Sequence, residues 1–192
     1  SVVMARVVNV TVVDIRDDIV QLINKGCSPI QDQGIEEQLK TVLASNRLKS
    51  RKYSASLIDD ADFIVLALPT NYNEIDGSFD TSALDDVLEN IAANDRNKTI
   101  IIKSTIPVGY TEQAIQKHKF TECFFSPEFL REGRATYDNL HPSRIIVGSC
   151  SPSAKEFVEI LDRASHKRNI KKIYTDNKTA EVTKLSANSY LA

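Results

Sequence analysis

The stretch VTVVDIRDDIVQLINK, residues 10–25, decides the fold class because its character changes in the middle. Residues 10–15 form a β-branched run that is too short for a helix. A polar, helix-compatible segment, residues 16–25, follows this run at once. The stretch therefore predicts a strand that leads directly into a helix.

The same alternation of strand and helix recurs along the rest of the chain. Helices are predicted at residues 80–93, 151–168 and 179–192, where the sequence has helical patterns. The predicted strands are apolar almost throughout, and such strands are covered by helices on both faces. We therefore predict an α/β domain, a doubly wound, Rossmann-like, mostly parallel sheet with helices on both faces. Further strands are predicted at residues 63–68, 99–103, 122–125, 144–148 and 171–175.

Composition and charge restrict the partners that this chain of 192 residues can have. With 42% hydrophobic residues and a formal net charge of -2, it can bury a core but lacks the basic character typical of nucleic-acid binding. No window approaches the ~18 consecutive apolar residues that a membrane span needs. We therefore expect no nucleic acid and no membrane as partners.

The three cysteines, Cys27, Cys123 and Cys150, are widely spaced in the sequence. They form no CxxC pair and no histidine pattern typical of a zinc site. We interpret them as core or loop residues rather than nucleophiles, and we expect no metal. A reducing, cytoplasmic location fits this use of cysteine best.

The residues that follow each strand are the candidates for function, because ligands of doubly wound sheets bind beyond the carboxyl ends of the strands. Asp14 ends the first predicted strand. An acidic residue there accepts hydrogen bonds from both adenosine ribose hydroxyls of NAD and repels the 2′-phosphate of NADP. The alternative is that Asp14 caps the following helix. The glycine-rich turn GxGxxG does not occur in this sequence.

Two more strands end in a hydroxyl residue combined with a proline. The segments are PTN at residues 69–71 and STIPVG at residues 104–109. Proline fixes the backbone, so Thr70, Ser104 and Thr105 can present polar groups towards a cofactor or a water. Turn formation alone is the alternative explanation of both segments.

The segment FSPEFLREG, residues 125–133, places two glutamates beside a strand end. If one of the two carboxylates is partly desolvated, the pair can supply a general base near neutral pH. Glu128 and Glu132 are therefore candidates for acid/base chemistry. The alternative is a capping glutamate and a surface glutamate that pairs with Arg131 or Arg134.

Lys184 and Asn188 lie four residues apart in the last predicted helix and so share one helix face. A lysine and an amide aimed at one point can stabilise negative charge that develops on an oxygen. The alternative is a solvated lysine on an amphipathic helix.

These motifs, taken together and in this order, resemble the UDP-glucose/GDP-mannose dehydrogenase family. The wording LREG…YDNLHPSR looks most like the bacterial UDP-glucose enzymes of that family. Relatives that act on UDP-N-acetylmannosamine or GDP-mannose are alternatives, as is a non-catalytic, truncated relative that acts as a binding module. The motifs are SPIQD at 28–32, PTNYN at 69–73, KSTIPVG at 103–109, FSPEFLREG at 125–133, YDNLHPSRIIVG at 137–148 and AEVTKLSANSYLA at 180–192.

The resemblance implies an NAD-dependent oxidation of UDP-glucose to UDP-glucuronate, through an aldehyde and a thioester on an active-site cysteine. It implies that Asp14 binds the adenosine ribose of NAD and that Thr105 also holds a catalytic water. The residues implied to line the NAD site are Leu66, Ala67, Leu68, Pro69, Thr70, Ser104 and Thr105.

For the sugar, the resemblance implies acid/base chemistry by Glu128, most plausibly in thioester hydrolysis. It places Glu132 between cofactor and substrate as a second candidate for the base. Lys184 and Asn188 are implied to polarise the C6 oxygen and to stabilise anionic intermediates. The residues implied to contact the UDP-sugar are Glu128, Phe129, Leu130, Arg131, Lys184 and Asn188.

The resemblance also implies a domain organisation. Residues 1–175 are expected to form an NAD-binding Rossmann-like domain without its first strand and glycine-rich loop. Residues 176–192 are expected to begin the central helix through which the full-length protein forms a homodimer. The UDP-binding domain and the catalytic cysteine are expected beyond Ala192, so the isolated chain should be inactive. Ile19 stands where the family usually has a basic residue.

Overall fold

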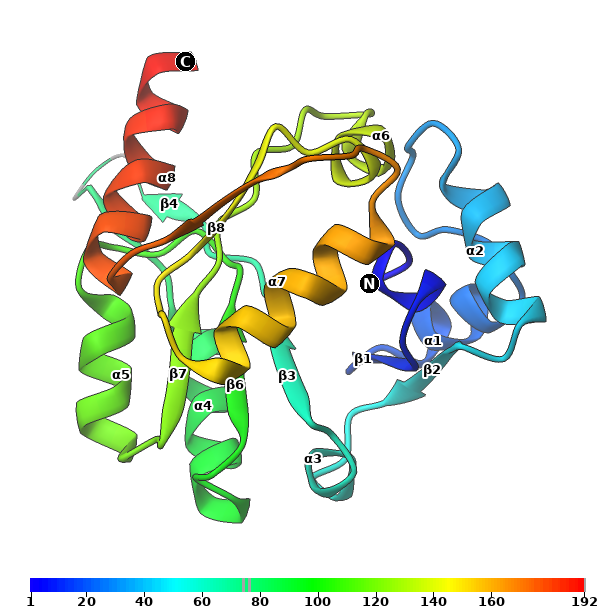
Figure 1. Ribbon diagram of the computed structural model, residues 1–192. Coiled ribbons are helices and arrows are strands. Elements are labelled where there is room, and N and C mark those ends of the chain that lie inside the picture. The colour runs from blue at the N-terminus through cyan, green and yellow to red at the C-terminus, as the bar shows by residue number, and fades with distance from the viewer. Residues whose placement is uncertain (74, 76, 192) are drawn as a thin grey trace. The chain divides into compact units, whose positions relative to one another are not determined.

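The computed structural model describes residues 1–73, 75 and 77–191, which fall into two compact units. Unit 1 comprises residues 1–54, 129–144 and 156–171. Unit 2 comprises the described residues of the ranges 55–128, 145–155 and 172–192. Figure 1 traces the helices and strands of each unit along the chain.

Helices and strands occur in both units. Unit 1 contains η1 (Met4–Arg6), β1 (Val10–Asp14), α1 (Asp17–Asn24), α2 (Ile35–Ala44), β2 (Leu48–Lys52) and α6 (Ala135–Leu140). Unit 2 contains α3 (Ser56–Asp59), β3 (Phe63–Leu66), β4 (Tyr72–Asn73), β5 (Ser78–Phe79), α4 (Ser82–Asn94), β6 (Thr99–Ile102), α5 (Tyr110–His118), β7 (Glu122–Phe125) and α8 (Asn177–Leu191). Residues of both units make up β8 (Arg144–Val147), α7 (Pro152–Ala164) and β9 (Lys171–Tyr174).

In unit 1, β1 and β2 pair in parallel, from Val10 opposite Leu48 to Asp14 opposite Lys52. Ile19 packs against the core of this unit. Burial of its apolar side chain therefore accounts for an isoleucine at this position. The buried residues of this core are Ala5, Ile23, Leu39, Val42 and Leu48.

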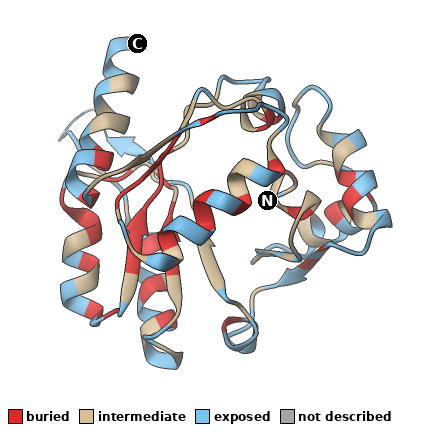
Figure 2. Ribbon diagram, viewed as in Figure 1, coloured by how far each residue is buried: buried red, intermediate tan, exposed pale blue. Residues whose placement is uncertain are grey.

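In unit 2, the strands form a parallel sheet in the order β3-β6-β7. Because β6 lies between two strands and its side chains are apolar, residues 100–102 are completely buried. Figure 2 shows β6 and β7 largely in the colour of buried residues. The largest buried apolar side chains of unit 2 are those of Leu84, Leu88, Ile91, Ile100, Ile101, Ile102, Ile106, Phe124 and Phe125.

The predicted α/β class with parallel strands is confirmed, and every predicted strand is present, at most two residues shorter than expected. The predicted helix at residues 151–168 ends earlier, at Ala164, and the last helix begins at Asn177. Ala192, where that helix was expected to end, lies outside the described residues. The sequence did not predict α2, β2 or α5.

Gly148 follows β8 and lies against the start of α8. Its amide donates to the Phe125 carbonyl oxygen at 2.8 Å. A Cβ atom on Gly148 would clash with Asn177 Oδ1 and lie 2.8 Å from Asn177 Cα. Because this forces packed backbone to move, we expect Gly148→Ala to lower the free energy of unfolding by about 2 kcal/mol, measured by urea denaturation.

Gly133→Ala is the matched control for this substitution. Gly133 has a φ of 69°, and no atom lies within 4 Å of its added Cβ. In Gly133→Ala the free energy of unfolding should therefore fall only by the cost of a left-handed backbone at alanine, about 1 kcal/mol. A smaller loss in Gly148→Ala than in Gly133→Ala would contradict the close packing of α8 on β8.

Candidate active site

The loops that follow β3 and β6 are tied to each other by side-chain hydroxyls. Thr70 Oγ1 donates to the Thr105 carbonyl oxygen at 2.6 Å, and Ser104 Oγ donates to the Leu68 carbonyl oxygen at 2.8 Å. Each hydroxyl can still accept a hydrogen bond, because a hydroxyl oxygen carries two lone pairs. The two loops therefore form one rigid edge at the carboxyl ends of the strands.

Apolar surface at this edge suits a flat ring. Leu66 is buried at the end of β3, whereas Ala67 and Pro69 are exposed in the loop that follows. Exposed apolar groups beside fixed hydroxyl oxygens match the needs of a nicotinamide ring and its ribose. Of the residues expected to line the cofactor site, unit 2 thus brings together the two segments 66–70 and 104–105.

Two lysines flank Glu128 in the same unit. Lys103 Nζ lies 3.8 Å from Glu128 Oε2 and donates to the Ser126 carbonyl oxygen at 3.2 Å. Lys184 Nζ donates to the Glu128 carbonyl oxygen at 2.6 Å. The strand-end glutamate and the helix lysine, which are far apart in the sequence, are therefore neighbours.

Burial perturbs both lysines of this cluster. It lowers the pKa of Lys103 below the usual lysine range, the Glu128 carboxylate opposes that shift, and Lys184 adds to it. Burial also lowers the pKa of Lys184, again opposed by Glu128. Perturbed groups that gather at strand ends are typical of active sites.

The helix α8 is held by a row of polar side chains on one of its faces. Asn177 Oδ1 accepts a hydrogen bond from the Phe125 amide at 2.8 Å. Glu181, which is completely buried, binds the first turn of α5. Lys184 and Asn188 continue the row at helical spacing, and the exposed Asn188 lies beyond Lys184 along the chain. In Figure 1, α8 begins beside the amino end of α5.

Asp14 lies at the carboxyl end of β1 in unit 1. Its Oδ1 atom accepts a hydrogen bond from the Arg16 amide at 2.8 Å. The N-cap residue of α1 is Arg16, and no side chain caps this helix. The alternative interpretation of Asp14 as the N-cap of α1 is therefore wrong, and its carboxylate lies at the carboxyl end of a strand.

Three of the residues expected to contact the sugar, Phe129, Leu130 and Arg131, lie in unit 1. The Arg144 guanidinium carbon lies 4.4 Å from the centre of the Phe129 ring. Arg131 binds Asp138 through its amide, Nε and Nη2, at 2.9, 3.1 and 2.6 Å. These bonds lower the pKa of Asp138. The expected alternative, a glutamate that pairs with Arg131, is thus replaced by Asp138, while Leu130 is half-buried and Glu132 is exposed.

A cavity of about 650 Å³ lies in unit 1 beside Arg131. Of the described residues expected to contact the sugar, Arg131 alone lines it. Thr136 also lines the cavity, and its amide donates to Asp32 Oδ1 at 2.9 Å. The lining residues are Gln33, Gly34, Glu37, Gln38, Arg131, Arg134, Thr136, Tyr137 and Leu140.

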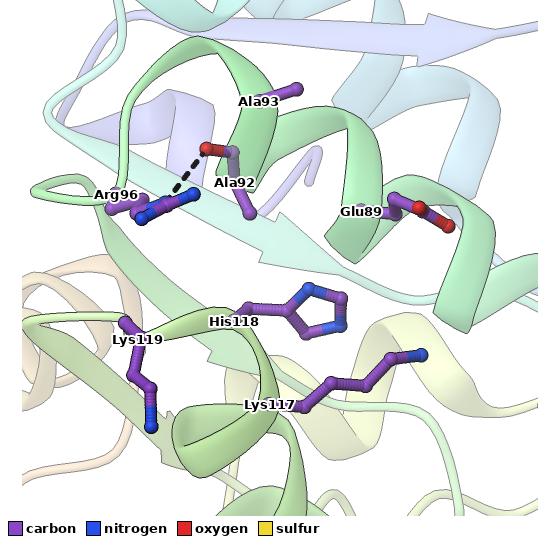
Figure 3. A pocket seen from close by; sticks show the side chains of 7 residues that line it. All are labelled: Glu89, Ala92, Ala93, Arg96, Lys117, His118 and Lys119. Carbon is purple, nitrogen blue, oxygen red and sulfur yellow. Dashed lines mark hydrogen bonds between the residues drawn. The ribbon is translucent and has the colours of Figure 1, made fainter.

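A cavity of about 250 Å³ in unit 2 lies away from the strand ends that carry the candidate site. Figure 3 shows the His118 ring projecting between the last turns of α4 and α5, which precede the amino ends of β6 and β7. Burial lowers the pKa of His118. The basic residues that line this cavity lie at helix ends, where cations stabilise the last carbonyl groups of a helix. Arg96 Nε, for example, donates to the Ala92 carbonyl oxygen at 3.2 Å.

The three cysteines are free thiols that differ in exposure. Cys123 is buried in β7, and burial raises the pKa of its thiol to about 12. Cys27 and Cys150 are exposed. Among the described residues, no group of three or more His, Cys, Asp or Glu side chains could hold a metal ion. No helix among residues 1–73, 75 and 77–191 is long and apolar enough to cross a membrane.

Sequence reasoning missed two charged residues of this region, Lys103 and Glu181. Lys103 ends the apolar strand TIIIK, and its charge at that point was the available signal. Glu181 precedes Lys184 by three residues and Asn188 by seven, so the helical spacing could have placed it on their face. Its complete burial could not be read from the sequence.

Comparison with known proteins identifies relatives of the whole chain. The model of the UDP-glucose/GDP-mannose dehydrogenase family, NAD binding domain, matches residues 1–177. A UDP-glucose 6-dehydrogenase of Campylobacter jejuni is 39% identical over 187 residues, which are 95% of this chain and 46% of the relative. One of Streptococcus pneumoniae is 37% identical over 198 residues, or 100% of this chain and 50% of the relative. The chain spans about half the length of these curated relatives.

A solved structure with the same fold supports these matches. The UDP-glucose dehydrogenase of the hyperthermophilic archaeon Pyrobaculum islandicum is 27% identical and gives a TM-score of 0.86. The match covers 99% of this chain and 46% of that chain. This chain therefore shares its α/β fold with about half of that structure.

Proposed function

Because the chain belongs to the UDP-glucose/GDP-mannose dehydrogenase family, we propose that it is the NAD-binding part of a UDP-glucose 6-dehydrogenase. NAD is the cofactor of this domain. The full-length enzyme oxidises UDP-glucose to UDP-glucuronate in two steps, through a thioester on a cysteine outside residues 1–192. The observation that supports this activity most directly is the contact of Lys184 with Glu128, because it joins an oxyanion-stabilising group to an acid/base group.

The residues of unit 2 have distinct tasks in this proposal. Lys184 donates hydrogen bonds to the C6 oxygen and stabilises the negative charge that develops there, with Asn188 as a second donor. Glu128 accepts the proton that the C6 hydroxyl loses, directly or through a water held by Thr105. When bound, NAD would supply the acceptor for the hydride that leaves C6. In the final hydrolysis, Glu128 accepts a proton from the attacking water.

The proposal also assigns the chain a place in a longer protein. Residues 1–175 bind NAD, and residues 176–192 begin a central helix that continues into a homodimer interface. Residues beyond 192 contribute the nucleophilic cysteine and the UDP-binding domain. In this arrangement the isolated chain cannot form the thioester, so it should bind NAD without turnover.

The substrate is tested by assaying the full-length protein with three nucleotide sugars. We expect NADH formation with UDP-glucose at a kcat/KM well above that with UDP-N-acetylmannosamine or GDP-mannose. A higher kcat/KM with one of the other two sugars would support a dehydrogenase but assign it that sugar as substrate in place of UDP-glucose. Absence of NADH with all three would favour the binding module instead.

Asp14→Ala is expected to raise the dissociation constant of NAD about tenfold in the full-length protein, because two ribose hydroxyls lose a charged acceptor. Isothermal titration calorimetry with NAD and NADP measures this change. The same variant should narrow the preference for NAD over NADP, since the carboxylate no longer repels the 2′-phosphate.

Asp17→Asn is the matched control, because Asp17 is an exposed carboxylate three residues further on that pairs with Lys52 at 3.0 Å. Its NAD affinity should stay within about twofold of the unchanged protein. An Asp14 variant that binds NAD as tightly as this control would remove Asp14 from the cofactor site.

A further inference from the structure

Lys103 is a lysine whose side chain is largely enclosed, with 14% of its surface exposed. Its amide donates to the Leu66 carbonyl oxygen at 2.8 Å, so its backbone is fixed between β6 and the end of β3. Its Nζ atom lies between the Ser126 carbonyl oxygen at 3.2 Å and Glu128 Oε2 at 3.8 Å. The ammonium group thus spans the segment 126–128 from one side.

Enclosing an ammonium group is costly, and the sequence keeps a charge where an apolar side chain would suit the sheet. The Glu128 carboxylate lies close enough, at 3.8 Å, to attract this ammonium group, and it opposes the lowering of the Lys103 pKa by burial. The other recorded charged neighbour is Lys184, which approaches the same segment through the Glu128 carbonyl oxygen. One lysine therefore holds the backbone of Glu128 while the other faces its carboxylate.

We propose that Lys103 is a positioning residue that directs the Glu128 carboxylate towards the strand ends, and this inference rests on the acid/base role proposed for Glu128. The hydrogen bond to Ser126 fixes the ammonium group relative to the segment that carries the glutamate. At 3.8 Å the ammonium attracts the carboxylate by charge without forming a short hydrogen bond. The carboxylate oxygens therefore stay available for proton transfer.

The first test is Lys103→Met in the full-length protein. We expect kcat with UDP-glucose to fall about 30-fold while the KM for NAD changes less than about twofold, because the base is misplaced and cofactor binding is not. Lys103→Arg keeps the charge and should recover most of the lost kcat. A fall in both variants together with a changed KM for NAD would indicate a merely structural lysine and would overturn the inference.

Lys178→Met is the matched control. Lys178 is a lysine of α8 that pairs with Glu112 at 2.8 Å and is more than half exposed, so this variant also breaks one lysine ion pair of unit 2. Its kcat should equal that of the unchanged protein. If Lys178→Met lowers kcat as much as Lys103→Met, the effect is not specific to Glu128.

A double substitution tests whether Lys103 acts through Glu128. In a Glu128→Gln background, Lys103→Met should cause no further loss of kcat, because the group that it positions is already disabled. A full additional loss would show that Lys103 acts independently of Glu128 and would overturn the inference.

A readout without substrate separates this inference from the proposed function. Competitive acetylation of the full-length protein, followed by mass spectrometry, measures the reactivity of the Lys103 amine. Removing the Glu128 charge should lower the pKa of Lys103, so Glu128→Gln should make Lys103 more reactive at mildly alkaline pH than it is in the unchanged protein. Unchanged reactivity overturns the inference, whereas a protein that makes no NADH but shows the shift contradicts the proposed function alone.

Discussion

Replacing Glu128 with glutamine is expected to lower kcat for UDP-glucose oxidation by the full-length protein about a thousandfold, because glutamine cannot accept a proton. Glu128 is half-buried between Lys103 and Lys184, and glutamine has nearly the same shape. The backbone contact of Lys184 with residue 128 should therefore persist, and NAD affinity should stay unchanged. Steady-state kinetics with NADH absorbance as the readout measures the loss.

Glu132→Gln is the comparison that assigns the base. Glu132 is exposed, four residues along the same segment, and carries the same charge. We expect Glu132→Gln to lower kcat less than about tenfold, since a solvated carboxylate is not held for proton transfer. If Glu132→Gln is the more severe variant, the base is Glu132 and the role given to Glu128 is wrong.

Replacing Glu181 with leucine is expected to lower the free energy of unfolding by about 4 kcal/mol. The buried carboxylate accepts hydrogen bonds from the Gly109 amide at 2.5 Å, the Thr111 amide at 3.0 Å and the Thr111 hydroxyl at 2.6 Å. Leucine would leave all of these donors buried without a partner. It would also remove a negative charge from the amino end of α5, where the helix dipole favours one. Urea denaturation of the isolated chain measures the change.

Two further variants are the controls for the loss of stability in Glu181→Leu. Glu181→Gln keeps an acceptor oxygen but presents an amide group to one of the donors, so its loss should be smaller than that of leucine. Glu112→Gln breaks the exposed pair with Lys178 and should cost at most about 1 kcal/mol. A leucine variant that is no less stable than Glu112→Gln would mean that Glu181 does not anchor α8.

The elements that the sequence predicted are those whose burial is visible in their composition. The strand at residues 99–102 is apolar on both faces because it lies between two other strands. In contrast, β2 reads LKSRK, and only Leu48 and Ser50 of its five residues are buried. The helix α5 buries Tyr110, Thr111 and His118, side chains that do not form an apolar stripe. Tertiary pairing, not local preference, creates these two elements.

The residues of the candidate site could also be predicted only in part. Glu128 and Lys184 could be named as candidates from a strand end and from helix spacing, and the family resemblance implied their roles. Their contact could not be predicted, since 56 residues separate them and the hydrogen bond uses a backbone carbonyl. Lys103 and Glu181 escaped notice because a buried charge is recognised only by the partners that surround it.

The most direct test of the central claim is the amount of NADH that the full-length protein forms from limiting UDP-glucose, with UDP-glucuronate measured in the same sample. We expect two NADH for each UDP-glucuronate formed, and none from residues 1–192 alone. One NADH per sugar, or turnover by the isolated chain, would contradict a two-step oxidation that depends on a cysteine outside these residues.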